Sequence, residues 1–200
     1  MDISKQNYLK KIAEYVACMF DSRTTSELCY HNLEHTKAVV KNAAEMADFY
    51  RLKNKERFIL LAAAWFHDTG QLFGPMDGHE KRGAFIMEQF LRSHKIDASI
   101  IVEINKAIMA TEANTKPTNL IEDILRDSDV YHLGTKDFRQ TDELVWKETE
   151  QRSGHIIPDK FQKSLDFLNK HCFYTAYCKD RLLTGKKANI EYLKGLIKAF

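Results

Sequence analysis

Glycine and proline are scarce in this sequence, which has 8 and 3 of them among 200 residues. Collagen-like, low-complexity and many-stranded β proteins need far more turn residues, so the scarcity excludes these classes. Intrinsic disorder is excluded as well, because 44% of the residues are hydrophobic and 29% are charged. A chain of this length suits one globular domain.

The sequence also lacks long apolar runs and closely spaced pairs of cysteines. No apolar stretch approaches the roughly eighteen residues that a membrane span needs. The four cysteines show no metal-site spacing such as C-x-x-C. The first residues, MDISKQNYLKK, are polar and charged, unlike a signal peptide. We therefore expect a reduced, cytoplasmic protein without a membrane partner.

Neither sign of charge dominates, since the formal net charge is +2. Residues 160–200 nevertheless carry nine Lys and Arg against three Asp and Glu. We interpret this surplus as a solvated face of the last helices, with a phosphate-rich or nucleic-acid partner as the alternative. We expect no nucleic-acid partner.

Apolar residues recur at helical spacing almost throughout, and no segment alternates as a strand does. The pattern predicts an all-α fold. Glycines, prolines and capping residues place the ends of the helices, and Gly185 is expected to separate the last two. The expected helices lie near 4–20, 32–52, 54–69, 79–95, 97–111, 118–133, 137–152, 159–171, 174–184 and 187–199.

Two of these helices carry polar residues where apolar ones are expected. His35 shares the core-facing side of its helix with Val39 and Ala43, although such a histidine is more often a satisfied core residue than a ligand. The next helix is apolar on every side and runs directly into His67 and Asp68. A buried carboxylate at a helix C-terminus is doubly unfavourable. A metal ion would offset both penalties, and so would a distant Lys or Arg.

A third candidate position lies near the end of the helix at 118–133. Asp129 interrupts an apolar row that includes Leu125 and Leu133. Asp127 is expected to be more exposed, so Asp129 is the better candidate, and the choice between them stays open. Nitrogen and oxygen donors without thiolate suit Mn, Fe, Co, Ni, Zn or Mg in a site with open positions. Water bound there becomes acidic enough to act as a nucleophile.

Three motifs stand in order along the chain: YHNLEH at 30–35, WFHDTG at 65–70 and RDSD at 126–129. They resemble the HD superfamily of metal-dependent phosphohydrolases, and more narrowly a group described as predicted metal-dependent HD phosphohydrolases. The similarity includes DSDVYHLG and FYTAYCK and spans about 28–185. It implies a single HD-type helical bundle over 1–200, with the metal-site core at about 28–135 and C-terminal helices at about 136–200 packed on it.

The resemblance also implies particular site residues. The implied ligands of a divalent metal ion are His35, His67, Asp68 and Asp129. His79 matches a histidine that many members place beside the metal, and it begins a predicted helix whose N-terminus can receive phosphate. Lys81 and Arg82 are candidate phosphate contacts, although exposed charges explain them more simply. Tyr30 and His31 are expected to orient His35.

The implied activity is hydrolysis of a phosphoester or phosphoanhydride in a small phosphorylated substrate such as a nucleotide. We expect Asp68 to orient the attacking water, and protonated His79 to stabilise the developing charge or protonate the leaving oxygen. Binuclear members carry a further histidine where this sequence has Ile108–Glu112, so we expect one tightly bound ion per chain, with a second, weaker ion through His79 left open. A di-iron oxygenase is the least favoured alternative. The alternatives are a non-catalytic nucleotide sensor and a nucleic-acid adaptor that uses residues 160–200.

Overall fold

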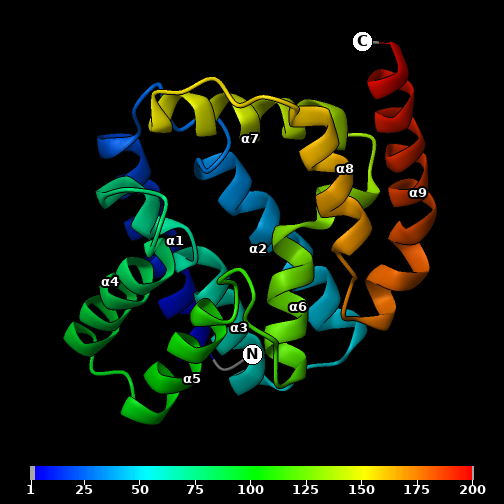
Figure 1. The fold of residues 1–200 in the computed structure, drawn as a ribbon. Coiled ribbons are helices and arrows are strands. Elements are labelled where there is room, and N and C mark those ends of the chain that lie inside the picture. Colours follow the sequence, from blue (N-terminus) through cyan, green and yellow to red (C-terminus); the bar gives the residue numbers. More distant parts are fainter. Residues whose placement is uncertain (1–2, 200) are drawn as a thin grey trace.

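The computed structural model describes residues 3–199, and these contain nine α-helices, two short 3-10 helices and no strand. The all-α prediction is confirmed. Helices α4 and α5 lie on one side of the molecule and α8 and α9 on the other, with α2, α3 and α6 between them (Figure 1). The α-helices are α1 (Ile3–Arg23), α2 (Leu33–Phe49), α3 (Asn54–Phe66), α4 (His79–Ser93), α5 (Ala98–Met109), α6 (Leu120–Asp129), α7 (Phe138–Ser153), α8 (Lys160–Lys170) and α9 (Ala176–Ala199); the 3-10 helices are η1 (Thr69–Phe73) and η2 (Tyr131–Gly134).

Helix α3 is the centre of the core. It packs against α1, α2, α5 and α6, and residues 58–64 are all buried. This burial explains why the helix is apolar on every side. Among these neighbours, α2 begins and α6 ends close to the C-terminus of α3.

The end of α3 differs from the prediction of a helix to residue 69. The α-helix ends at Phe66, His67 is the C-cap, and a tighter 3-10 turn begins at Thr69. Gly70 lies inside this turn, where a Cβ atom would come within 1.9 Å of the carbonyl oxygen of His79. Only glycine allows this close approach, which holds the start of α4 against the end of α3.

The C-terminal helix also differs from the prediction. Residues 176–199 form one helix, so the expected break near Gly185 is wrong. Position 185 has no room for a side chain, because a Cβ atom would lie 1.9 Å from the carbonyl oxygen of Gly134, at the end of η2. Its role is close packing between distant segments, and local sequence could not distinguish that from a helix end.

Contacts join the segment at 28–135 to the helices that follow it. Helix α9 packs against both η2 and α8, and η2 also packs against α7. The assignment of residues 1–200 to one domain stays a prediction, and these contacts favour it.

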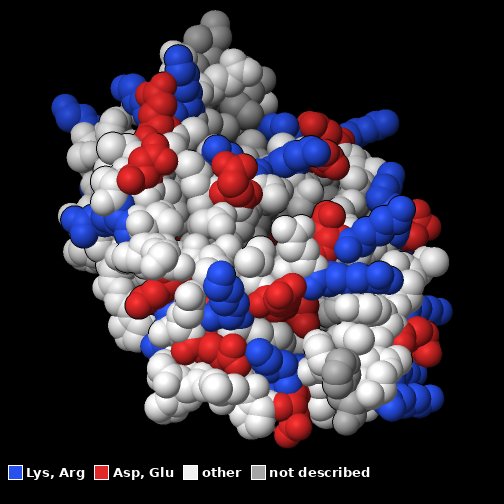
Figure 2. All heavy atoms as spheres, turned by 90° about the horizontal axis from the view of Figure 1, so that it is seen from above, with Lys and Arg blue, Asp and Glu red and all other residues white. Residues whose placement is uncertain are grey.

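Charged side chains of both signs are interspersed on the face shown in Figure 2, without a uniformly basic area. A search of the described residues for membrane-spanning helices finds none that is long and apolar enough.

Candidate metal centre

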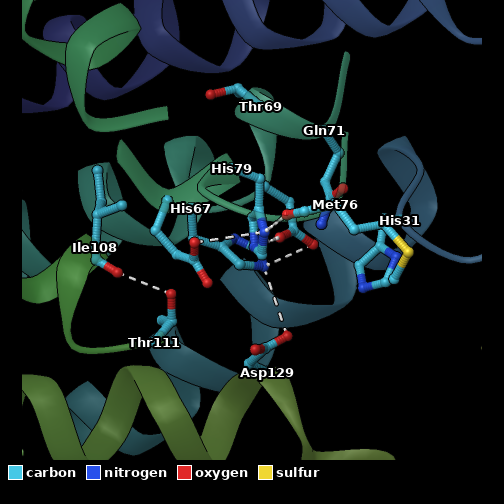
Figure 3. A network of polar contacts seen from close by, with 12 residues as sticks. His31, His67, Thr69, Gln71, Met76, His79, Ile108, Thr111 and Asp129 are labelled. Atoms are coloured by element: carbon cyan, nitrogen blue, oxygen red, sulfur yellow. Dashed lines mark hydrogen bonds and ion pairs between the residues drawn. The ribbon is translucent and has the colours of Figure 1, made fainter. Parts of the chain in front are cut away.

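Four side chains from three helix ends converge in the core. His35 lies in the first turn of α2, His67 and Asp68 follow the last residue of α3, and Asp129 ends α6. Each offers one nitrogen or oxygen, and these four atoms all lie within 4.8 Å of one another. Figure 3 shows His67 and Asp129 pointing into the same small space. The sequence-predicted ligands are thus brought together, although 94 positions separate His35 from Asp129.

Helix capping fixes the position of His35. The side-chain oxygen of Asn32 accepts hydrogen bonds from the backbone N–H groups of Glu34 and His35, which starts α2 at Leu33. The imidazole of His35 then reaches two carboxylates. Its Nε2 lies 3.1 Å from Asp129 Oδ1 and 3.3 Å from Asp68 Oδ2.

A backbone contact sets the orientation of His67. Its Nδ1 donates to the carbonyl oxygen of Ala64 at 2.8 Å. A carbonyl only accepts, so Nδ1 carries the proton and Nε2 faces the centre. That Nε2 lies 3.2 Å from Asp68 Oδ2, yet neither of these buried atoms has a hydrogen-bond partner among the residues that the structure describes. Two unsatisfied buried polar atoms side by side are what a bound cation would satisfy.

The imidazoles of the centre favour the ionised form of its two carboxylates. Burial alone would raise the pKa of Asp68, but the nearby imidazoles, His67 first, hold it well below its usual value. The imidazoles of His35 and His67 hold the pKa of Asp129 below its usual value in the same way, against burial. Both carboxylates are therefore ionised at neutral pH, as oxygen ligands of a divalent cation must be.

His79 lies directly beside the four residues. Its Nε2 is 3.3 Å from Asp68 Oδ1, while its Nδ1 donates to the carbonyl oxygen of Met76 at 2.8 Å. Gly78 precedes it in the left-handed conformation and starts α4. Figure 3 shows His79 next to His67 at the centre. Asp68 thus presents one oxygen to the ligand cluster and the other to His79.

Lys81 and Arg82 of α4 have no hydrogen bond or ion pair with the four converging residues within the described part of the chain. Lys81 is exposed on the surface. Arg82 donates to the carbonyl oxygens of Gly70, Asp77 and Pro75. These contacts make Arg82 a support of the loop between η1 and α4, and its role as a phosphate contact stays a prediction.

The two carboxylates at the end of α6 have opposite surroundings. The expectation that Asp127 is the more exposed one is wrong, because it is fully buried. Its carboxylate accepts hydrogen bonds from the backbone of Tyr174 and from the backbone and hydroxyl of Thr175. Asp127 therefore anchors the start of α9, whereas Asp129 faces the cluster.

Sequence reasoning missed Glu148, a fully buried residue of α7. It accepts hydrogen bonds from the backbone N–H groups of Tyr30 and His31. Its other oxygen lies 2.7 Å from His31 Nδ1 and 3.3 Å from Arg152. Glu148 thus holds the segment that leads into α2. No local signal identifies it, since its partners lie 117 and 118 positions away.

His132, which had no predicted role, contacts Tyr30, the residue that packs against His35. Its Nδ1 is 3.0 Å from the hydroxyl of Tyr30, whose ring packs against His35 at 4.5 Å between centroids. Burial lowers the pKa of His132 to about 3, so this ring is neutral. Tyr30 packs against His35 and His132 contacts Tyr30, so both support the position of His35 without adding charge to the centre.

Comparisons with known proteins agree with this geometry. The family model of the HD domain matches residues 32–134, just over half of the chain. The chain therefore belongs to the HD-domain family, and this family with the His and Asp cluster defines the class as a metal-dependent hydrolase.

Solved structures add a likeness of fold. The crystal structure of a predicted HD superfamily hydrolase from an uncultured Thermotogales bacterium is 19% identical to this chain, with a TM-score of 0.62. The match covers 96% of this chain and 92% of that one. No curated protein matches the chain.

Proposed function

We propose that this protein is a phosphohydrolase that cleaves a phosphoester or phosphoanhydride in a small phosphorylated substrate such as a nucleotide. The unsatisfied atoms His67 Nε2 and Asp68 Oδ2, beside His35 and Asp129, carry the proposal. With two imidazoles and two carboxylates, the set suits one ion of Mn, Fe, Co, Ni, Zn or Mg. Such an ion supplies Lewis acidity and lowers the pKa of bound water.

Asp68 and His79 are the proposed catalytic residues. One oxygen of Asp68 faces His35 and His67 and the other faces His79. Asp68 can therefore orient a water molecule and accept its proton. Burial lowers the pKa of His79, but the neighbouring Asp68 more than offsets this, and the net shift is upward. Because Nδ1 is committed to Met76, the extra proton of charged His79 is on Nε2, facing the centre. From there it can be donated to the leaving oxygen.

A cationic cavity next to Asp129 supports a phosphorylated substrate. It has a volume of about 620 Å³, and its lining includes Lys116 and Lys170 besides Asp129. Arg126 lines it as well, while its guanidinium donates to the carbonyl oxygens of Ala110 and Glu112. These cations would attract phosphate oxygens toward the centre. Lys81 and Arg82 stay predicted phosphate contacts beside them.

The test is metal analysis followed by a phosphate-release screen. Protein purified without added metal should contain about one divalent ion per chain. It should release phosphate from one of a panel of nucleoside mono-, di- and triphosphates, cyclic nucleotides and nitrophenyl phosphates. Asp68→Ala should lose both the ion and the turnover. Glu34→Ala, which removes an exposed carboxylate beside His35, should keep both. Turnover by metal-free Asp68→Ala, or a metal-loaded protein inert toward the whole panel, would overturn the proposal.

A further inference from the structure

A second cavity, of about 340 Å³, opens beside the metal centre, and the proposed reaction does not use its far end. Asp129, Tyr30 and His31 line the near end. Much of the remaining wall comes from α7 and α8, which lie beyond the residues matched by the family model. The far end is thus built by the C-terminal helices of this chain.

The walls of this cavity are mainly apolar and aromatic. The rings of Tyr30, His132, Trp146 and Phe167 all line it, together with aliphatic side chains. Aromatic faces favour stacking with flat rings, and a cavity of this size lies at the small end of ligand-binding pockets. Such a space suits the organic part of a small molecule better than its phosphate.

One carboxylate interrupts this apolar wall. Asp142 of α7 accepts a hydrogen bond from the hydroxyl of Ser164 at 2.6 Å, and that hydroxyl accepts one from Trp146 Nε1 at 2.7 Å. This chain of contacts fixes the carboxylate next to the indole. No ion pair joins Asp142 to a cationic side chain within the described part of the chain, and burial raises its pKa. A carboxylate accepts at about four positions, so Asp142 retains acceptor sites for a ligand.

We propose that this cavity binds the organic part of the substrate, a flat heterocycle with two adjacent N–H donors that pair with Asp142. The inference rests on the proposed function, because the phosphate of the same molecule would lie at the metal centre. A cationic ligand fits less well, since Lys163 lines the same cavity. A ring without adjacent donors would leave the Asp142 carboxylate desolvated and poorly paired. Asp142 is thus a specificity-determining residue.

Nucleoside binding tests this inference without any hydrolysis. Guanosine presents two adjacent N–H donors on one edge, inosine presents one, and adenosine places an acceptor next to its donor. Calorimetric titration of the metal-loaded protein should show guanosine binding about ten times more tightly than inosine. Adenosine should bind more weakly still. Equal affinities for the three nucleosides, or no binding of any, would overturn the inference.

Asp142→Asn separates recognition from a structural role. The amide keeps an oxygen for the Ser164 hydroxyl but presents an N–H₂ group where the carboxylate accepted a donor. The variant should therefore fold and lose the tenfold preference for guanosine over inosine. Glu143→Gln, a change at the exposed neighbouring residue, should keep that preference. An Asp142→Asn protein that retains the preference would refute the assignment.

The two proposals fail separately. Guanosine preference in a protein that releases no phosphate from any substrate would overturn the hydrolase and leave the pocket standing. Phosphate release without a preference among nucleosides would overturn the pocket and leave the hydrolase standing.

Discussion

Gly185→Ala should destabilise the protein strongly although it places a good helix former in a helix interior. The added Cβ would lie 1.9 Å from the carbonyl oxygen of Gly134 and 2.8 Å from its carbonyl carbon. Ordinary contacts of a Cβ begin at 3.4 Å, and the opposing atoms belong to backbone. No side-chain rotation can relieve this overlap, so α9 and η2 would have to move apart by about 1.5 Å, the difference between 3.4 and 1.9 Å.

The magnitude follows from two opposing effects. Overpacking a close contact costs about 1–3 kcal/mol and occasionally more, and a backbone overlap of this depth belongs at the upper end. Replacing glycine by alanine in a helix contributes about 1 kcal/mol in the other direction. We expect a net loss of about 2–3 kcal/mol in the free energy of unfolding. For a chain of this size that corresponds to a melting temperature lower by about 4–12 °C.

Gly195→Ala is the matched control in the same helix, because no atom of residues 3–199 lies within 4 Å of its Cβ position. It should raise the stability by up to about 1 kcal/mol. Both variants should be melted with a chelator present, since bound metal would add to the apparent stability. A Gly185→Ala protein as stable as Gly195→Ala would refute the close contact and the packing of α9 on η2.

Other variants test the surroundings of the centre. Asp129→Ala should lose the bound metal yet stay folded, whereas Asp127→Ala should melt several degrees lower and keep the metal; loss of metal from a folded Asp127→Ala protein would contradict these roles. Glu148→Gln should lower the free energy of unfolding in urea by about 1–3 kcal/mol, because the partly buried His31 and Arg152 lose their anionic partner, and stability equal to that of Glu143→Gln would argue against this. Burial raises the folded-state pKa of Asp142 above 3.8, so the stability it contributes is lost as pH rises through that pKa. Asp142→Asn should therefore melt above wild type at pH 7, by a margin that shrinks toward pH 4, and a constant margin would contradict the shift.

The helices and the converging side chains could be predicted because their signals are local. His35 occupies a core-facing position, and His67 and Asp68 end a helix that is apolar on every side, so each is conspicuous within a few residues. Asp129 could be ranked above Asp127 from its apolar row, yet the reason given for Asp127 was wrong. Asp127 is buried by hydrogen bonds to residues 47 and 48 positions away, which no local pattern reveals.

Long-range packing accounts for the other differences. Gly185 fits both a helix end and a close contact, and only the position of Gly134 distinguishes them. Glu148 and Asp142 sit in a helix with no motif, and their importance comes from what other elements place beside them. The same holds for the contacts of Arg82 with the carbonyl oxygens of Gly70, Asp77 and Pro75, which only the folded loop brings to it.

The attachment of Tyr30 and His31 to Glu148 has a consequence for protein synthesis. Their backbone amides are made 118 and 117 residues before the carboxylate that holds them. On the ribosome, the segment leading to the first ligand stays without its anchor until α7 has emerged. The support of His35 is thus completed later than the four converging side chains themselves, unlike a zinc finger, in which neighbouring ligands let the metal drive folding from the start.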